Sequence, residues 1–349
     1  MNRIDRPAEP LWVGLPGVDL DPESESLLAD HRPGGIVLFG RNCESPEQLG
    51  ALVRAIRRAL PGAILAIDAE GGRVDRLRGI VGPAPSAARL AAEPPCHAFE
   101  AGRAIGRSLR LFDLDVDFAP VVDLDRGKSG NALDDRTLGS HPGAVVERAR
   151  AFLAGLHAGG AGGCLKHFPG LGGAGEDTHL EGSVVAAGAD QIEEDLAPFI
   201  ALAATAGAVM IAHAAYPALD ADLRPATLSP PAHALLRHRL GREVLAISDD
   251  LEMKALDVWG DLPARTAACF AAGCDVLPVC KTLEALPEIA ARLADPALAP
   301  RHAEARLRTL RYRRRLEILR STQEHAAPWA GLEPEERLAA VRRELAELA

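Results

Sequence analysis

The sequence contains few aromatic residues, no excess of positive charge and no long uninterrupted hydrophobic segment. Aromatic side chains make up 4% of the 349 residues, whereas 48% are hydrophobic, so the core must rely on Ala, Leu, Val and Ile. The net charge of −10 argues against a nucleic acid as the main partner. There is no run of about 18 apolar residues and no apolar signal core at the N-terminus, so we expect neither a membrane span nor a leader.

The six cysteines lack the close pairing that is typical of zinc sites. The six are scattered along the chain, at Cys43, Cys96, Cys164, Cys269, Cys274 and Cys280. Three of them lie in apolar strand-like or helix-like contexts. We expect reduced, mostly buried thiols in a cytoplasmic protein that has no cofactor and no bound metal.

Short apolar segments alternate with longer amphipathic ones along the whole chain. The apolar segments are Leu11–Leu15, Gly35–Phe39, Ile64–Asp68, Val116–Asp123, Gly163–Phe168, Val209–Ala214, Val244–Asp249 and Asp275–Val279. Helical patterns lie between them, at Pro46–Leu60, Ala98–Phe112, Pro142–Ala158, Ala189–Ala206, Pro231–Leu240, Pro263–Ala272 and Leu283–Leu293. Eight such alternations, with strands apolar on both faces, predict a parallel (β/α)8 TIM barrel. A doubly wound open sheet is the alternative.

The C-terminal part predicts a helical extension of one barrel domain. Residues 301–320 hold eight arginines and two glutamates, which indicates a solvated closing helix whose arginine stems lie along the barrel. After a break at Pro328–Gly331, Glu335–Leu348 has an apolar stripe that we expect to dock on the barrel wall. We therefore predict a catalytic barrel over residues 1–322, an extension over 323–349, and a monomer or weak dimer.

One glycine-rich segment, Cys164–Glu181, carries the strongest chemical signal. Lys166 and His167 end an apolar strand, and a loop with four glycines follows and leads to Asp177 and His179. In an extended segment, side chains two residues apart point the same way, so this carboxylate can orient the imidazole as an acid/base group. The loop also matches Gly-x-Gly-x-x-Gly, but no amphipathic helix follows it and two acids would repel a phosphate.

Polar side chains collect where the other predicted strands end. They are Asp68, Glu70, Arg73 and Arg76 after the third, Asp123 and Arg136 after the fourth, His213 after the sixth, Asp249 and Asp250 after the seventh, and Cys280 and Lys281 after the eighth. Individually they have structural explanations: Asp68 or Glu70 can pair with a nearby arginine, and His213 can be a hydrogen-bonded core residue. Together, carboxylates and cations suit a polyhydroxylated substrate, and one of the two adjacent aspartates can face the centre as a nucleophile.

Three separated motifs resemble glycoside hydrolase family 3. They are Lys166–Gly170 with Asp177–His179, Ile67–Val74, and Ser248–Met253, and the similarity covers roughly Leu11 to Lys281. Within that family they are most similar to single-domain bacterial β-N-acetylglucosaminidases of peptidoglycan recycling. The resemblance implies that Asp249 is the nucleophile and that His179, oriented by Asp177, is the acid/base. It also implies sugar contacts from Asp68, Arg76, Arg136, Lys166 and His167, to which we add His213.

The sequence departs from the family pattern at two places. The usual Pro-Gly-His-Gly-Asp is Pro169–Gly173 here, with Leu171 and Gly173 in place of the His and the Asp. The usual Asp-Gln-Glu has Ala69 in its middle. We expect the first change to leave a looser arm, while neither change touches the nucleophile or the proton donor.

The function predicted from these features is retaining hydrolysis of terminal β-linked N-acetylglucosamine from a small carbohydrate substrate, through a covalent glycosyl-aspartate. A glycosyl phosphorylase or another β-glycosidase would share the same barrel. A metal-dependent hydrolase would need a tighter ligand cluster than Asp68, Glu70, His167, His213 and Asp249 provide. A non-catalytic sugar-binding barrel is the remaining alternative.

Overall fold

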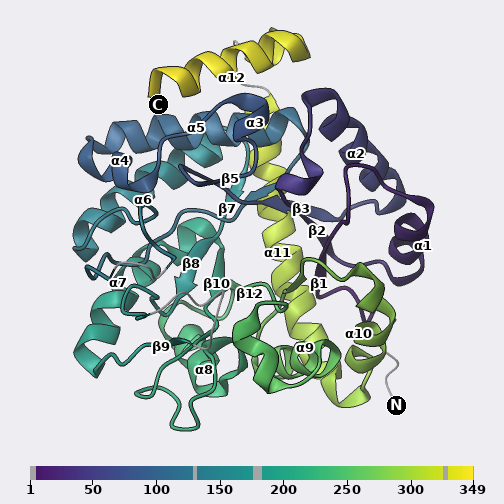
Figure 1. The fold of residues 1–349 in the computed structure, drawn as a ribbon, viewed down its shortest axis with the longest axis vertical. Helices are drawn as coiled ribbons and strands as arrows, with labels where there is room; N and C mark the ends of the chain where they lie inside the picture. The colour runs from purple at the N-terminus through teal and green to yellow at the C-terminus, as the bar shows by residue number, and fades with distance from the viewer. Residues whose placement is uncertain (1–4, 129–131, 176–182, 325–328, 349) are drawn as a thin grey trace.

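A computed structural model of the chain describes residues 5–128, 132–175, 183–324 and 329–348 (Figure 1). The strands are β1 Leu11–Gly14, β2 Gly35–Leu38, β3 Ile64–Ile67, β4 Ala69–Gly71, β5 Val74–Asp75, β6 Val116–Asp117, β7 Gly162–Gly163, β8 Leu165–Phe168, β9 Ser183–Val184, β10 Ala208–Ile211, β11 Ala214–Ala215, β12 Leu245–Ser248 and β13 Leu277–Val279. The helices are α1 Pro22–His31, α2 Pro46–Ala59, α3 Arg78–Val81, α4 Ala87–Ala92, α5 Pro95–Leu111, α6 Pro142–Ala158, α7 Ala189–Ala206, α8 Pro230–Arg239, α9 Leu262–Ala272, α10 Leu286–Leu293, α11 Ala299–Glu324 and α12 Pro334–Leu348.

Parallel strands form the centre of the molecule, and the longer helices lie around them (Figure 1). One sheet has the order β13-β1-β2-β3-β6-β7, and a second has the order β12-β10-β8. A single residue, Cys164, separates β7 from β8, and an isolated parallel bridge joins Ile247 of β12 to Val276, just before β13. The predicted α/β class with a parallel sheet is confirmed.

Each predicted apolar segment contains a strand, but the fourth is shorter than the sequence indicates. Within Val116–Asp123, only β6 belongs to the sheet. Pro120 has no N–H to donate, so the regular ladder cannot continue through it. Pairing resumes at Val121, which forms an isolated bridge to Lys166.

The sequence interpretation missed α1, α3, α4 and the β4–β5 hairpin. Helix α1 nevertheless has a local start signal, because the Asp21 side chain accepts a hydrogen bond from the Ser24 N–H ahead of Pro22. In the hairpin, Gly71 has φ +89° and a side chain there would approach the Pro85 carbonyl to 2.1 Å. Only glycine fits that turn, which a sequence alone does not reveal.

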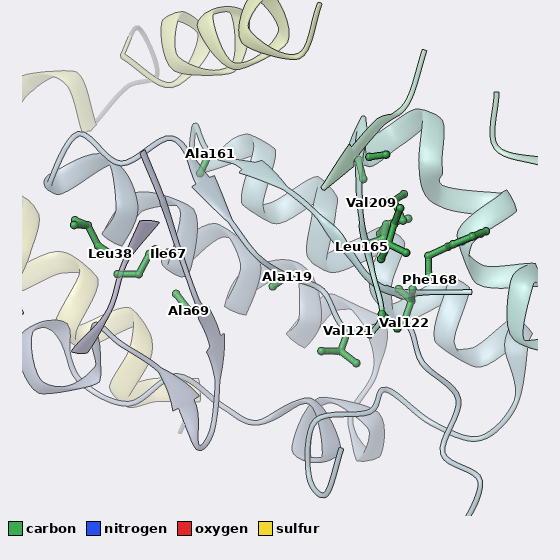
Figure 2. Close-up of a cluster of buried hydrophobic side chains, with 14 of the residues drawn as sticks. Leu38, Ile67, Ala69, Ala119, Val121, Val122, Ala161, Leu165, Phe168 and Val209 are labelled. Atoms are coloured by element: carbon green, nitrogen blue, oxygen red, sulfur yellow. The ribbon is translucent and has the colours of Figure 1, made fainter. Parts of the chain in front are cut away.

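Apolar side chains form two clusters on opposite faces of the strands. The larger packs the strands against the helices, and part of it, including Leu38, Ile67, Leu165 and Phe168, is drawn in Figure 2. The smaller contains Trp12, Val37, Ile64, Ala66, Val116, Phe118, Cys164, Ala208, Met210, Leu245, Ile247, Val276, Tyr312 and Leu316. Since its last two members belong to α11, that helix covers one end of this inner cluster.

The arginines of α11 are not simply solvated, which corrects the sequence interpretation. Arg301 and Arg308 contact Asp275 at 3.0 and 2.7 Å, and Arg237 of α8 contacts it at 2.7 Å. Asp275 is fully buried, and although burial raises the pKa of its carboxyl, the three guanidinium charges bring it below its usual value. A comparable group forms at Asp115, which pairs with Arg57, Arg110 and Arg320. The arginines therefore attach α11 to the strands.

The last helix packs on the outside of the domain, along α5 (Figure 1). Val341 and Leu345 of the predicted stripe are buried, Arg107 pairs with Glu344, and Arg342 donates 2.8 Å to the Ile80 carbonyl. Helix α12 thus lies against α5 and α3. Helix α11 runs to Glu324, past the predicted boundary at residue 322. Within the described ranges, no helix is both long and apolar enough to cross a membrane.

Candidate active site

A cavity of about 350 Å³ opens at the carboxyl ends of the parallel strands. It is lined by Val37, Phe39, Asp68, Arg73, Val74, Arg76, Phe118, Ala132, Arg136, Lys166, His167, Met210, Asp249, Asp250, Pro278 and Cys280. Its wall includes the predicted residues Asp68, Arg76, Arg136, Lys166, His167 and Asp249. Loops that are far apart in the sequence meet here because parallel strands place their carboxyl ends at one edge.

Four charged side chains form a buried network in one wall of the cavity. Lys166 lies 2.8 Å from Asp68 Oδ1 and also contacts Glu70, while Arg136 binds Glu70 through two 2.8 Å hydrogen bonds. Both bonds run from one guanidinium to one carboxylate, the bidentate geometry that favours Arg over Lys. The structural alternative, an ion pair of Asp68 or Glu70 with a nearby arginine, holds for Asp68, which Arg76 approaches to 4.0 Å, whereas Glu70 reaches across to the loop after β6.

The network keeps its members charged although they are buried. Burial alone would raise the pKa of Glu70, but the charges of Lys166 and Arg136 outweigh it and lower that pKa to about 2. Conversely, burial lowers the pKa of Lys166, but Asp68 and Glu70 outweigh burial and raise it. The cavity therefore presents fixed charges that can bind hydroxyl groups without changing protonation near neutral pH.

Two arginines of the loop after β3, Arg73 and Arg76, differ in their contacts. Arg76 places Nη2 4.0 Å from Asp68 Oδ2, so it faces the cavity beside the network. Arg73 donates to Asp135 at 2.8 Å and to the Asp134 carbonyl at 3.0 Å. We assign Arg73 to tying two loops together, and Arg76 remains the predicted sugar contact.

His167 is oriented by a carboxylate that the sequence interpretation left without a role. Asp123 is fully buried and accepts 2.7 Å hydrogen bonds from His167 Nδ1 and from the Leu171 N–H. It also accepts from the His167 N–H at 3.1 Å. A carboxylate at Nδ1 fixes the ring so that Nε2 is the nitrogen left for the cavity side.

Asp249 and Asp250 both line the cavity, which corrects the expectation that only one of them can face it. Strand β12 ends at Ser248, so the alternation of side chains stops before these residues. The Asp250 N–H donates 2.8 Å to Asp249 Oδ1. Burial, together with the charges of Glu252 and Asp249, raises the pKa of Asp250 to about 6.

The base of the glycine-rich loop is anchored, whereas the far end of the arm lies outside the described residues, so a looser arm stays a prediction. Leu171 is 3% exposed and its N–H binds Asp123. The Tyr216 hydroxyl donates 2.9 Å to the Gly170 carbonyl. The predicted acid/base His179 and its partner Asp177 lie outside the described residues.

His213 is near the site but does not line the cavity. It is 1% exposed, and its ring nitrogens lie 2.9 Å from Thr227 Oγ1 and 2.9 Å from the Asp250 carbonyl. A sugar contact from His213 stays a prediction.

The sequence of this chain matches the family model "Glycosyl hydrolase family 3 N terminal domain" over residues 12–309. The chain belongs to glycosyl hydrolase family 3. The family predicted from the three motifs is thereby confirmed.

Family-3 relatives cover most of the chain. A β-hexosaminidase of Alkalilimnicola ehrlichii is 40% identical over 300 residues, which is 82% of this chain and 85% of that protein. NagZ from Neisseria gonorrhoeae, solved in complex with N-trifluoroacetyl-D-glucosamine, is 30% identical with a TM-score of 0.80 and 98% of both chains covered. A family-3 β-N-acetylglucosaminidase from Paenibacillus sp. has a TM-score of 0.83 at 27% identity, covering 97% of this chain and 67% of that one.

Some site residues of this family-3 chain escaped sequence reasoning. Phe39 and Phe118 add aromatic surface to the cavity, and the Arg41 guanidinium lies 4.7 Å from the centre of the Phe39 ring. Next to Phe118, Asp117 is fully buried and its Oδ2 has no hydrogen-bond partner among the described residues, and burial raises its pKa well above the usual value. Phe39 ends a predicted apolar segment, so its position was the available signal. Nothing in the sequence marked Asp117.

The thiols and the candidate metal ligands form no metal-binding group in the part of the chain that is described. Four of the six cysteines are buried, Cys43 is partly exposed and Cys96 is exposed, and all six are free thiols, as predicted. Among the described residues, no group of three or more His, Cys, Asp or Glu side chains is arranged to hold a metal ion.

Proposed function

We propose that this family-3 chain is a retaining β-N-acetylhexosaminidase that releases terminal β-linked N-acetylglucosamine. The observation that carries the proposal is that Asp249 shares one cavity with Asp68, Arg76, Arg136, Lys166 and His167. Relatives covering most of the chain are named β-hexosaminidases, and NagZ was solved with an N-acylated glucosamine. A cavity of about 350 Å³ is of a size suited to a single sugar ring and its acyl group.

In the proposed mechanism the reaction proceeds in two steps, formation of a glycosyl-enzyme and its hydrolysis. The Asp249 carboxylate attacks the anomeric carbon and forms an ester, while the glycosidic bond breaks and its oxygen takes a proton from His179. Water then attacks the same carbon, gives its proton to His179 and frees Asp249 as a carboxylate. In this scheme Asp177 stabilises the charged imidazole ring.

The five polar residues around Asp249 have the task of holding the sugar. Asp68 and His167 offer an acceptor and a donor to hydroxyl groups, and Arg76, Arg136 and Lys166 offer donors. Because the ion pairs among them are formed before substrate arrives, the orientation of these groups costs little on binding.

Turnover of an aryl β-N-acetylglucosaminide tests this function. Asp249→Ala should abolish turnover, whereas Asp257→Ala, which changes a largely exposed aspartate paired with Arg265, should leave it unchanged. His179→Ala should spare a substrate with a good leaving group more than one with a sugar leaving group, because only the latter needs protonation. Equal losses with both substrates would contradict the acid role of His179.

The same assay separates the alternative functions. Faster turnover of an aryl β-glucoside would indicate another β-glycosidase, and dependence on inorganic phosphate would indicate a phosphorylase. Sugar binding without turnover would indicate a non-catalytic barrel.

We also infer that the two sheets together form one (β/α)8 barrel, residues 1–322, with residues 323–349 as its extension. The inner apolar cluster takes members from all eight predicted strand segments, from Trp12 through Cys164 to Val276. The β7–β8 continuity at Cys164 and the Ile247–Val276 bridge lie where the two sheets would have to join. A flat sheet could not bring its two edges to one cluster.

For the biological setting we propose the turnover of cell-wall peptidoglycan fragments by a cytoplasmic monomer or weak dimer. The support is the family's β-N-acetylglucosaminidase relatives. Sedimentation of the purified chain, and turnover of a muropeptide carrying terminal N-acetylglucosamine, would test this setting.

A further inference from the structure

His213 connects a buried hydroxyl to the backbone beside the proposed nucleophile. It follows β10, which ends at Ile211, and lies between Thr227 Oγ1 and the Asp250 carbonyl, 2.9 Å from each. Thr227 is fully buried in a short 3-10 turn, Ala226–Leu228. The imidazole therefore has a rigid support on one side and the Asp249–Asp250 segment on the other.

The hydrogen bonds define the tautomer of the ring. A backbone carbonyl can only accept, so His213 Nε2 must carry the proton that it donates to Asp250 O. In the neutral ring, Nδ1 then accepts from the Thr227 hydroxyl. The direction of donation runs from Thr227 through His213 to Asp250.

The residues on either side of Asp250 are held by the sheet. The Asp249 N–H donates 3.1 Å to the Ile211 carbonyl, and the Leu251 N–H donates 3.0 Å to the Pro278 carbonyl. Between these two anchors, the Asp250 N–H binds Asp249 Oδ1 at 2.8 Å. The Asp250 N–H thus holds one oxygen of the Asp249 carboxylate, and His213 binds the carbonyl of Asp250 from outside the cavity lining.

We propose that His213 and Thr227 are positioning residues that orient the Asp249 carboxylate for attack, rather than ligands of the sugar. The inference rests on the proposed role of Asp249 as nucleophile. Both steps of the reaction make or break a bond to Asp249, so misplacement slows both. A displacement of about 1 Å at a reacting group can cost about 100-fold in rate.

Two variants remove the connection at different points. Thr227→Val keeps the size of the side chain and deletes only the hydroxyl, whereas His213→Phe deletes both hydrogen bonds. His213→Gln is the conservative variant, because its amide can still donate to the Asp250 carbonyl. His302→Phe is the matched control: His302 makes the same kind of bond, 2.9 Å to the Leu293 carbonyl, but lies on α11 outside the cavity lining.

The measurement is the rate at which 5-fluoro-N-acetylglucosaminyl fluoride labels the protein, followed by intact mass, with the labelled residue mapped by peptide mass. Values of kcat and KM for an aryl β-N-acetylglucosaminide are measured in parallel. We expect His213→Phe to slow labelling and kcat by about 10- to 100-fold, with KM little changed. Thr227→Val should show a smaller loss of the same kind, and His213→Gln should recover part of the loss.

Unchanged labelling in His213→Phe and Thr227→Val, or a raised KM at unchanged kcat, would overturn the positioning role. An equal fall of kcat in His302→Phe and His213→Phe would also overturn it, because any histidine replacement would then slow the protein. If His213→Phe does not fold, the Thr227→Val result decides alone. Failure of the proposed function looks different, because the wild-type protein would then carry no label on Asp249.

Discussion

Replacing Lys166 by Met tests how much the buried ion network of the cavity contributes to stability. Lys166 is 2% exposed, and its ammonium group contacts both Asp68 and Glu70. Methionine fills a similar volume but removes the cation, which leaves Glu70 with Arg136 as its remaining partner in the network. The change therefore isolates the charge of one side chain.

The magnitude follows from the pKa of Glu70. Burial raises this pKa, but Lys166 and Arg136 outweigh burial and lower it from 4.5 to about 2. A shift of this size corresponds to about 3 kcal/mol, and breaking a buried pair typically costs about 3–5 kcal/mol. We expect Lys166→Met to lose about 3 kcal/mol of unfolding free energy near neutral pH.

The pH dependence gives the sign of the effect. Because the folded pKa of Glu70 lies below its unfolded value, the wild-type contribution is complete above about pH 4.5 and is lost as the pH falls toward about 2. In the variant the buried carboxyl resists ionisation, so the difference between the two proteins should grow as the pH rises from about 4 to about 7.

Urea unfolding at several pH values measures this difference. The double variant Lys166→Met/Glu70→Gln should lose the pH dependence of the difference, because the buried carboxyl that resists ionisation is then gone. A loss below about 1 kcal/mol at neutral pH, or an equal loss at every pH, would refute the reasoning.

Three further substitutions test other parts of the structure. Asp275→Asn removes the charge that three arginines share. We expect the free energy of unfolding, measured in urea, to fall by about 3–5 kcal/mol while KM is unchanged. A loss of activity without a loss of stability would contradict this. Tyr216→Phe deletes the hydroxyl bonded to the Gly170 carbonyl and should cost about 1 kcal/mol in the same assay. Asp117→Asn should be neutral or stabilising, increasingly so as the pH rises, because the raised folded pKa of Asp117 penalises its ionised form. Urea unfolding from about pH 4 to about pH 8 checks this, and a constant loss would argue that the Asp117 carboxyl is ionised in the folded state.

The order and type of most elements could be predicted because their signals are local. Helix α6 spans Pro142–Ala158 and α7 spans Ala189–Ala206, as the apolar spacing predicts. Helix α2 begins after Ser45, whose side chain accepts from the Gln48 N–H, a local cap of a helix that was predicted from Pro46. Short elements such as α3 and the β4–β5 hairpin depend on packing with distant chain, so their sequences carry too little signal.

The members of the site were predictable, but their partners were not. Parallel strands deliver their carboxyl ends to one edge, so Lys166 and Asp249 were expected to meet. The pairing of Glu70 with Arg136, 66 residues away, depends on how two loops cross the cavity. The bond from His167 to Asp123 likewise depends on the end of β8 lying against the segment that follows β6.

The sequence by itself determined the family, the alternation of strands and helices, and which polar side chains end the strands, since these follow from short-range patterns and motifs. Only the tertiary structure decided which charge neutralises which, that Asp250 as well as Asp249 faces the cavity, and that His213 holds the backbone beside it. The physical reason is that ion pairs and buried hydrogen bonds depend on distances of a few ångströms between residues far apart in the chain, and local patterns do not specify those distances.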